Sequence, residues 1–308
     1  MGGLHNADAP GVKMCAVGFP DDRGLQVTLK ALGVGPEALL GHGGEAWVYA
    51  LDDHRVVRVL HAARDVETIH RRQALVDELA SHGAPFELPE LIEVGEVDGR
   101  HFAVERRLPG RSVMAQLEAL DGAERDLLVE RHLEATKALG RLHLEPRGWF
   151  GDLVAPNPVR APSWRAYLEQ RAAKSLRLST PAFRAIDPAS LVQSLPEAAA
   201  PAFVHLDAFA GNMLARGSTI TAVLDIGLTS AVGDARLDPL ASAVYLASPQ
   251  ITPVATSRDV DVGMSWLRGA GLAEWFEPAR RWLAAFWCSA VDDVRLHQWC
   301  RSVLVDHI

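Results

Sequence analysis

The residue types best suited to chemistry lie within residues 203–227, FVHLDAFAGNMLARGSTITAVLDIG. Asp207 and Asn212 follow the order Asp-x-x-x-x-Asn in one loop, and Asp225 comes after a short hairpin. Both carboxylates follow strongly apolar segments, where an unpaired charge would be costly. Phosphoryl transfer requires a carboxylate that orients and deprotonates a hydroxyl, and oxygen ligands for the magnesium that neutralises a triphosphate. We therefore predict Asp207 as the catalytic base, with Asn212 and Asp225 as magnesium ligands.

His205 precedes Asp207 in the same loop, and we include it among the candidate catalytic residues. A lone histidine beside an apolar strand is more often a hydrogen-bonded structural residue than a reacting one. We therefore expect His205 to brace the loop rather than to contact a substrate.

Two regions of different character must position this loop. Residues 1–109 read as an N-terminal lobe that contains a mostly antiparallel sheet of roughly five strands with one helix. Residues 110–308 read as a larger, mainly helical lobe, in which the hairpin before Asp225 is the only strand-rich part. The predicted fold class is therefore α+β, with a cleft between two lobes that could bind a ligand. The expected strands cover residues 38–51, 56–61, 88–97 and 101–108, and the expected helices cover 22–33, 65–82, 123–144, 162–178 and several segments after 238.

A glycine-rich segment lies on the first expected hairpin. Gly41, Gly43 and Gly44 precede Val48 in the sequence LGHGGEAWV. Because glycine has no side chain, such positions let backbone N–H groups approach phosphates closely. The spacing is similar to a kinase glycine-rich loop with Ala46 in place of the last glycine, although a plain hairpin turn explains the glycines equally well. We predict that these three glycines and Val48 contribute to a nucleotide site.

Arg58 lies on the next expected strand, where a cation would reach the α- and β-phosphates. A guanidinium can hold phosphate through a bidentate fork, and an arginine on the solvated face of a strand is the alternative. Its expected partner is a carboxylate on the following helix. The sequence leaves Gln73, Asp77 and Glu78 open for that position.

The segment ERRLPG, residues 105–110, forms the expected connector between the two lobes. An adenine bound there would take hydrogen bonds from the main chain around Glu105 to Arg107. Such contacts require no particular side chain, so the prediction rests on position alone.

Together these residues resemble the aminoglycoside phosphotransferase and choline kinase family, which has the protein-kinase-like fold. The resemblance covers about residues 35–245. Leu206 stands where the family has glycine, Ala235 stands where it has proline, and Arg58 stands where antibiotic kinases typically carry lysine. The matching segments are ERRLPG at the connector, LGRLH at 139–143, VHLDAFAGN at 204–212, VLDIG at 223–227 and GDARLD at 233–238.

The resemblance implies a small-molecule kinase that uses ATP, with GTP left open, and Mg²⁺. The implied substrate is a small molecule with a hydroxyl group, first of all an aminoglycoside or a related antibiotic. A metabolic kinase for choline, a sugar or an amino alcohol is the second reading. A pseudokinase-like binding module is the third, motivated by Arg58 and its unassigned partner, and the intact Asp207, Asn212 and Asp225 count against it.

The second half of the chain offers two sets of candidate substrate contacts. Asp259, Asp261, Asp292 and Asp293 could pair with ammonium groups, although a solvated helix face or a cap is the commoner role of such residues. Tryptophans and phenylalanines could instead line a pocket for a quaternary amine. The helical spacing of Trp282, Phe286 and Trp287 favours core packing for those three. The aromatic residues concerned are Trp266, Trp275, Phe276, Trp282, Phe286, Trp287 and Trp299.

Composition limits the classes of molecule that the protein is expected to bind. The 308 residues carry a formal net charge of −8, which disfavours nucleic acid and is compatible with a cationic substrate. No apolar run reaches the roughly 18 residues of a membrane span, and the N-terminus has no signal-peptide pattern. Three cysteines at unrelated spacings give no disulfide framework. We expect a cytoplasmic protein without nucleic-acid or membrane partners, as a monomer or homodimer.

Overall fold

Alternating apolar residues on neighbouring strands build the first lobe. Tyr49, Val57, Val59 and Val104 are buried on one face of a five-stranded antiparallel sheet, as the period of two in a strand requires. The strand order is β1-β2-β3-β5-β4. The computed structural model describes residues 22–43, 46–61 and 66–306. The strands are β1 (Leu39–His42), β2 (Ala46–Ala50), β3 (Arg55–Leu60), β4 (Leu91–Val97) and β5 (Arg100–Arg106).

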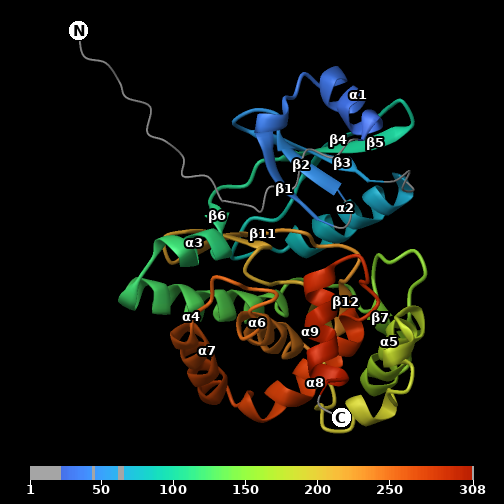
Figure 1. Cartoon of the computed structure of the whole chain (residues 1–308), viewed down its shortest axis with the longest axis vertical. Coiled ribbons are helices and arrows are strands. Elements are labelled where there is room, and N and C mark those ends of the chain that lie inside the picture. Colours follow the sequence, from blue (N-terminus) through green and yellow to red (C-terminus); the bar gives the residue numbers. More distant parts are fainter. Residues whose placement is uncertain (1–21, 44–45, 62–65, 307–308) are drawn as a thin grey trace.

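Two helices pack on this sheet, one on each side (Figure 1). Helix α1 (Arg23–Ala31) inserts Leu25 and Leu29 into the cluster of Val57 and Val104. Its first turn is capped by the side chain of Asp22, which accepts a hydrogen bond from the backbone N–H of Leu25. Helix α2 (Val66–Ala80) lies on the side that faces the second lobe, and its buried side chains join the core of that lobe.

The second lobe is mainly helical, as predicted. Helix α6 lies at its centre, and every residue of it is buried among α4, α7 and α8. The helices are α3 (Val113–Ala119), α4 (Gly122–Leu139), α5 (Trp164–Leu178), α6 (Leu237–Leu246), α7 (Ser257–Gly269), α8 (Phe276–Trp287) and α9 (Val294–Leu304). Short 3-10 turns occur at η1 (Pro36–Ala38), η2 (Pro181–Phe183), η3 (Ala189–Leu191) and η4 (Ala273–Trp275).

The predicted hairpin is β10 (Met213–Arg216) and β11 (Thr219–Val223), and β6 (Arg111–Ser112) adds a third strand in the order β11-β10-β6. The expectation that this hairpin is the only strand-rich part was wrong. A second sheet, β8-β7-β12-β9, lies in the same lobe. Its strands are too short for an alternating pattern to be visible in the sequence: β7 (Phe150–Asp152), β8 (Arg160–Ala161), β9 (Ala202–Val204) and β12 (Ala231–Gly233).

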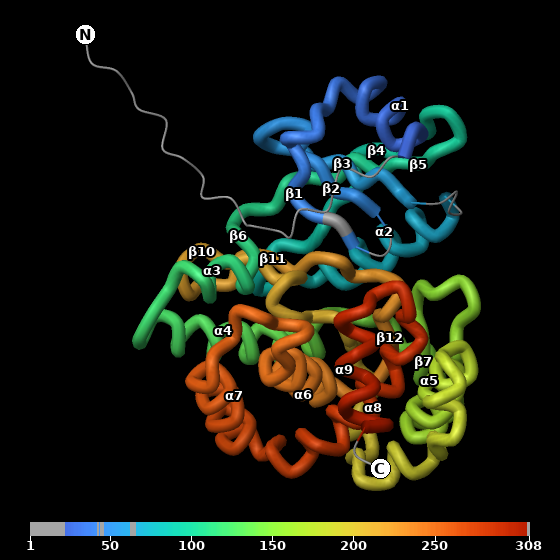
Figure 2. The backbone as a smooth tube through the Cα atoms, viewed as in Figure 1, coloured from blue at the N-terminus to red at the C-terminus, as the bar shows by residue number. Residues whose placement is uncertain are grey.

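The hairpin is anchored to the connector between the lobes, where β6, β10 and β11 gather (Figure 2). The hydroxyl of Thr221 donates to the carbonyl of Pro109 at 2.5 Å. Gly110 has φ 117°, and a Cβ there would meet the carbonyl oxygen of Ala215 at 2.8 Å. Only glycine fits a backbone that approaches this closely. The connector and the hairpin are therefore held against each other.

The described part of the chain contains no helix with the length and apolarity needed to cross a bilayer. Cys288 and Cys300 are buried free thiols, and Cys15 lies outside the described residues. The exact division into lobes at residues 109 and 110 stays a prediction.

Candidate active site

The three residues predicted to act together lie at one end of the hairpin. The side-chain amide of Asn212 donates to the carbonyl oxygen and to Oδ2 of Asp207, both at 3.0 Å. The carbonyl of Asn212 accepts a hydrogen bond from the backbone N–H of Leu224 at 2.8 Å, and Leu224 precedes Asp225. The loop of Asp207 and the end of β11 are therefore adjacent, although many residues separate them in sequence.

The side chain of His205 connects the loop of Asp207 to the end of β11. Its Nε2 lies 2.8 Å from the carbonyl oxygen of Leu224, and its Nδ1 accepts the backbone N–H of Asp207 at 3.2 Å. This pattern fits a neutral ring with its proton on Nε2. Burial lowers the pKa of His205 below its usual value, which favours the same neutral form. The imidazole is fully buried and braces the loop.

One face of α6 supplies most of the remaining partners of the loop. The carboxylate of Asp238 accepts the backbone N–H of His205 at 2.9 and 3.1 Å and that of Leu206 at 2.8 Å. Ser242 and Tyr245 donate to the carbonyls of Ala208 and Leu206, each at 2.8 Å. Positions 238, 242 and 245 repeat at helical spacing, so all three side chains point the same way. Sequence reasoning gave these residues no role, although polar residues at this spacing in an apolar helix were a usable signal.

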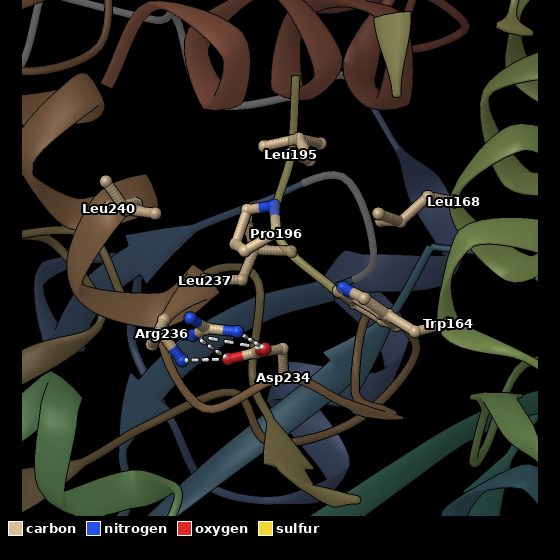
Figure 3. A pocket seen from close by; sticks show the side chains of 8 residues that line it. All are labelled: Trp164, Leu168, Leu195, Pro196, Asp234, Arg236, Leu237 and Leu240. Atoms are coloured by element: carbon tan, nitrogen blue, oxygen red, sulfur yellow. Dashed lines mark hydrogen bonds and ion pairs between the residues drawn. The ribbon is translucent and has the colours of Figure 1, made fainter. Parts of the chain in front are cut away.

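Burial raises the pKa of Asp238 to about 7, against the opposing effect of the two backbone N–H groups. Figure 3 shows how the turn before this helix is fixed. Asp234 and Arg236 form a multiply hydrogen-bonded ion pair at the edge of a small crevice. The crevice is lined mainly by the apolar side chains of Trp164, Leu168, Leu195, Pro196, Leu237 and Leu240. Its lining includes none of Asp207, Asn212 and Asp225.

Two non-glycine residues of the site have left-handed backbone conformations. Leu206 has φ 66° and Asp225 has φ 55°. A buried leucine in this region is strained, and such residues persist only where their surroundings fix them. Leu206 is fully buried, so the position tolerates leucine through packing and through the hydrogen bonds from α6.

Arg58 points to Asp225, with its Nη2 3.0 Å from Oδ1. The Asp225 side chain retains 37% of its exposure, which leaves oxygen surface open to a ligand. Burial opposes ionisation of this carboxyl, but the charges of Arg58 and Arg72 outweigh it and hold the pKa at about 2. Asp225 is therefore ionised at neutral pH.

The partner expected for Arg58 on the following helix is not among the contacts described. Gln73 accepts the backbone N–H of Leu91 and donates to Asp77, while Glu78 pairs with Arg147. Besides Asp225, a second carboxylate lies near Arg58: Oε1 of Glu105 on β5 is 3.9 Å from its Nε. Helix α2 contributes Arg72, whose Nη1 lies 3.4 Å from the same Oε1. Sequence reasoning missed Arg72.

The glycine-rich segment forms the β1–β2 hairpin. The backbone N–H of Gly43 donates to the carbonyl of Ala46 at 3.0 Å, and Val48 lies directly opposite Arg58 in the β2–β3 ladder. A Cβ at Gly41 or Gly43 would meet no atom of the described chain within 4 Å. Packing within the described chain therefore does not require glycine at these positions. Gly44 lies outside the described residues.

At the connector, Glu105 directs its carboxylate to Arg58 and Arg72. The backbone N–H of Arg107 donates to the carbonyl of His54 at 2.7 Å, and that of Arg106 donates to the carbonyl of Glu90 at 2.9 Å. Both N–H groups are engaged within the sheet edge, so an adenine at this connector would have to use other main-chain groups.

The acidic candidates in the second lobe differ in position. Asp259 is buried, pairs with Arg125 at 2.6 Å and caps α7, so it is not a substrate contact. Asp293 caps α9, and Asp261 and Asp292 are exposed. Trp282 and Phe286 pack in the core as their spacing predicted, whereas Trp287 is only partly buried and donates to the hydroxyl of Tyr245 at 2.8 Å.

The donor set fits magnesium better than a metal that needs an all-protein cage. Across the described residues, no group of three His, Cys, Asp or Glu side chains could hold a metal ion. Magnesium is commonly bound by one or two carboxylates, with phosphate and water oxygens completing its shell. The ionised and partly exposed Asp225, beside Asn212, matches that mode.

A five-stranded lobe, a short connector and a helical lobe with this loop and hairpin define a protein-kinase-like fold. Aminoglycoside phosphotransferases of known structure share it at low sequence identity. The ADP-bound APH(2'')-Ib structure is 18% identical with a TM-score of 0.55, and the match covers 92% of this chain and 97% of that chain. The type VIII aminoglycoside-3'-phosphotransferase is 19% identical with a TM-score of 0.56, covering 86% of this chain and 100% of that one.

The sequence profile of the phosphotransferase enzyme family matches residues 38–253. The chain therefore belongs to this family, and it is a small-molecule kinase. Among curated proteins, none matches it in sequence.

Substitutions at Leu206 should separate packing from backbone strain. Leu206→Ala should lower the free energy of unfolding by about 3 kcal/mol, because a buried leucine leaves a cavity. Leu206→Gly should be no less stable than Leu206→Ala, since glycine relieves about 1 kcal/mol of left-handed strain that alanine retains. Chemical denaturation measures both. Leu133, buried within α4, provides the control pair, where glycine should be the worse residue by about 1 kcal/mol. If the glycine variant is also the less stable one at position 206, the proposed backbone strain at Leu206 is contradicted.

The raised pKa of Asp238 should make stability fall as the pH rises. A folded-state pKa of about 7, above the usual 3.8, means that the folded protein binds this proton more tightly than the unfolded chain. The resulting stabilisation is complete below about pH 4 and is lost towards pH 7. Urea unfolding at pH 5 and pH 8 should show the wild type losing stability relative to Asp238→Asn. A difference that does not change with pH would mean that Asp238 titrates normally.

Proposed function

We propose that this kinase transfers the γ-phosphoryl group of ATP to a hydroxyl group of an aminoglycoside or a related antibiotic. One observation carries the proposal. Asp207 and Asn212 are hydrogen-bonded to each other at the end of the hairpin that carries the ionised Asp225. This geometry supports a base and two metal ligands directed to one place.

Asp207 would orient the acceptor hydroxyl and receive its proton. A positioned base of this kind contributes roughly 10²–10⁴-fold to the rate. His205 would act as a positioning residue, since its ring nitrogens are engaged by the loop and by Leu224. Magnesium held by Asp225 and Asn212 would neutralise the charge on the phosphate oxygens.

The first lobe would hold the nucleotide. Arg58, with the backbone of Gly41, Gly43 and Gly44, would bind the phosphates, and Val48 would lie against the nucleotide from β2. The adenine would contact main-chain carbonyls between Glu105 and Arg107, because the N–H groups of Arg106 and Arg107 are already engaged. GTP is an alternative donor, since similar structures include GDP complexes of aminoglycoside phosphotransferases.

The family and the net charge of −8 support an aminoglycoside acceptor. Similar structures include a streptomycin–ATP complex and a gentamicin complex of APH(2'')-IIa. A polycationic substrate would be attracted to an acidic protein before it binds. With the buried Asp259 excluded, the exposed Asp261, Asp292 and Asp293 are the remaining acidic candidates among those predicted, and Asp293 already caps α9.

A panel of aminoglycosides, macrolides, choline and amino alcohols, incubated with ATP and magnesium, should identify the acceptor. Mass spectrometry should show one compound gaining one phosphoryl group. Asp207→Ala should abolish turnover while ADP binding, measured by calorimetry, remains within a few-fold of wild type. Asp98→Asn, in the exposed turn between β4 and β5, is the control for loss of an acidic side chain outside the site. Turnover that persists in Asp207→Ala would remove Asp207 as the base, and a panel without any product would sink the proposed acceptor class.

A second candidate, an amino-alcohol or choline kinase, is favoured by Trp287. Its indole is partly exposed and donates a hydrogen bond to the hydroxyl of Tyr245. That hydroxyl in turn donates to the carbonyl of Leu206 in the catalytic loop. An aromatic face in that position could hold a quaternary amine by cation–π attraction. The same panel decides between the two candidates, because product would then form from choline and not from the antibiotics.

Gly43→Ala should weaken nucleotide binding without loss of stability. The added Cβ meets no described protein atom, so the free energy of unfolding should change by less than about 0.5 kcal/mol. ADP affinity should fall roughly tenfold if a phosphate must approach the backbone there. Gly269→Ala, at a similarly open position at the end of α7, should leave ADP affinity unchanged and should not lower the free energy of unfolding, because alanine is the better helix former. Unchanged ADP affinity in Gly43→Ala would mean that the phosphates bind elsewhere.

A further inference from the structure

Arg72 reaches from α2 into the site beside Asp225. Its Nε donates to the carbonyl of Ile226 at 2.7 Å, and its Nη1 lies 3.4 Å from Oε1 of Glu105. Its Nη2 is buried, and among the described residues it has no hydrogen-bond acceptor. The side chain as a whole is only 17% exposed. A buried guanidinium nitrogen without an acceptor is costly, so this group is suited to an anionic ligand.

Arg58 and Arg72 share one carboxylate. Nε of Arg58 lies 3.9 Å from the same Oε1 of Glu105 that Arg72 approaches. With Asp225 included, the four side chains carry two positive and two negative formal charges. Among the contacts described, Glu105 therefore lies near two guanidinium groups at once, while Asp225 is the carboxylate proposed above to hold a metal.

We propose that Arg72 is a second phosphate-binding cation, which acts with Arg58 on the phosphates of the bound nucleotide. This inference rests on the proposed function. Arginine carries five N–H donors in a planar fork, so Arg72 can keep its bonds to Ile226 and Glu105 while Nη2 serves a phosphate oxygen. The attraction of both guanidinium groups to Oε1 of Glu105 favours positions close to each other.

A purely structural role for Arg72 is the competing explanation. In that case the residue only ties α2 to the segment of Asp225 and Ile226. A structural tether would affect adenosine and ADP alike, because both depend on the same fold. A phosphate ligand would affect ADP alone. The ratio of the two affinities therefore distinguishes the roles.

The experiment measures ADP and adenosine binding to the full chain by calorimetry, with magnesium and again with EDTA. Arg72→Met keeps the length of the apolar stem and removes the donors. It should weaken ADP binding about 10- to 100-fold, the range of a charged hydrogen bond, and leave adenosine within about twofold. Arg71→Met is the matched control, because Arg71 is the adjacent residue of α2 and its hydrogen bonds within the described part of the chain go to Thr68 and the carbonyl of Glu67. It should change neither affinity.

The outcomes separate the inference from the proposed function. If the wild type binds ADP no better than adenosine, there is no phosphate site, and the proposed function fails with the inference. If the wild type prefers ADP but Arg72→Met keeps the full preference, only the role of Arg72 is overturned. Thermal denaturation reports whether Arg72→Met is folded. If Arg72→Met is unfolded, the binding of the wild type in EDTA is the deciding measurement. With two guanidinium groups present and no magnesium, the wild type should bind ADP at least tenfold more tightly than adenosine. Equal affinities for ADP and adenosine would overturn the inference.

Discussion

The site depends on one buried set of hydrogen bonds, between the polar face of α6 and the main chain of the catalytic loop. Asp238, Ser242 and Tyr245 satisfy peptide groups of residues 205, 206 and 208 in a region from which water is excluded. Buried peptide groups are costly when unpaired, so the loop has little freedom once α6 is packed. This explains how a leucine can be held at φ 66° in the middle of the loop. The geometry of the Asp207 loop therefore depends on the packing of helix α6.

The loop and the hairpin are coupled by a second, smaller set of contacts. His205 bonds to both segments with its two ring nitrogens, and Asn212 bonds to Asp207 and receives the N–H of Leu224. Because the imidazole is buried and neutral, it fixes position without adding charge to the site. The charges near Asp225 then come from the other lobe, through Arg58 and Arg72. The connector at Pro109 and Gly110 packs on β10 and β11, and this contact helps to fix the position of the first lobe relative to the hairpin.

Sequence patterns predicted the features that depend on residues close together in the chain. The five long strands and the main helices follow from periodicity, and Asp207, Asn212 and Asp225 lie within one short segment whose hairpin sets their proximity. Strands of two or three residues were missed because they form where the packed chain aligns them, without a pattern of their own. The ion pairs of Arg58 were also missed, since they join residues distant in sequence. The sequence left the partner of Arg58 on α2 open among Gln73, Asp77 and Glu78. The α2 side chain described near Glu105 is that of Arg72, and a helix turns about 100° per residue, so Gln73 and Arg72 face different neighbours.

The position of Glu105 changes what α2 can control. Glu105 lies opposite Val56 in the β3–β5 ladder, and Arg58 is two residues further along β3, so both side chains project from the same face of the sheet. A carboxylate on a strand keeps its distance to Arg58 when the neighbouring helix shifts, whereas a carboxylate on that helix would not. Helix α2 contributes a cation instead, and that cation is tied to the carbonyl next to Asp225. Displacement of α2 would therefore leave the Arg58–Glu105 contact in place and remove Arg72 from the site. The carboxylate shared by Arg58 and Arg72 is thus part of the sheet, and helix α2 carries the additional positive charge.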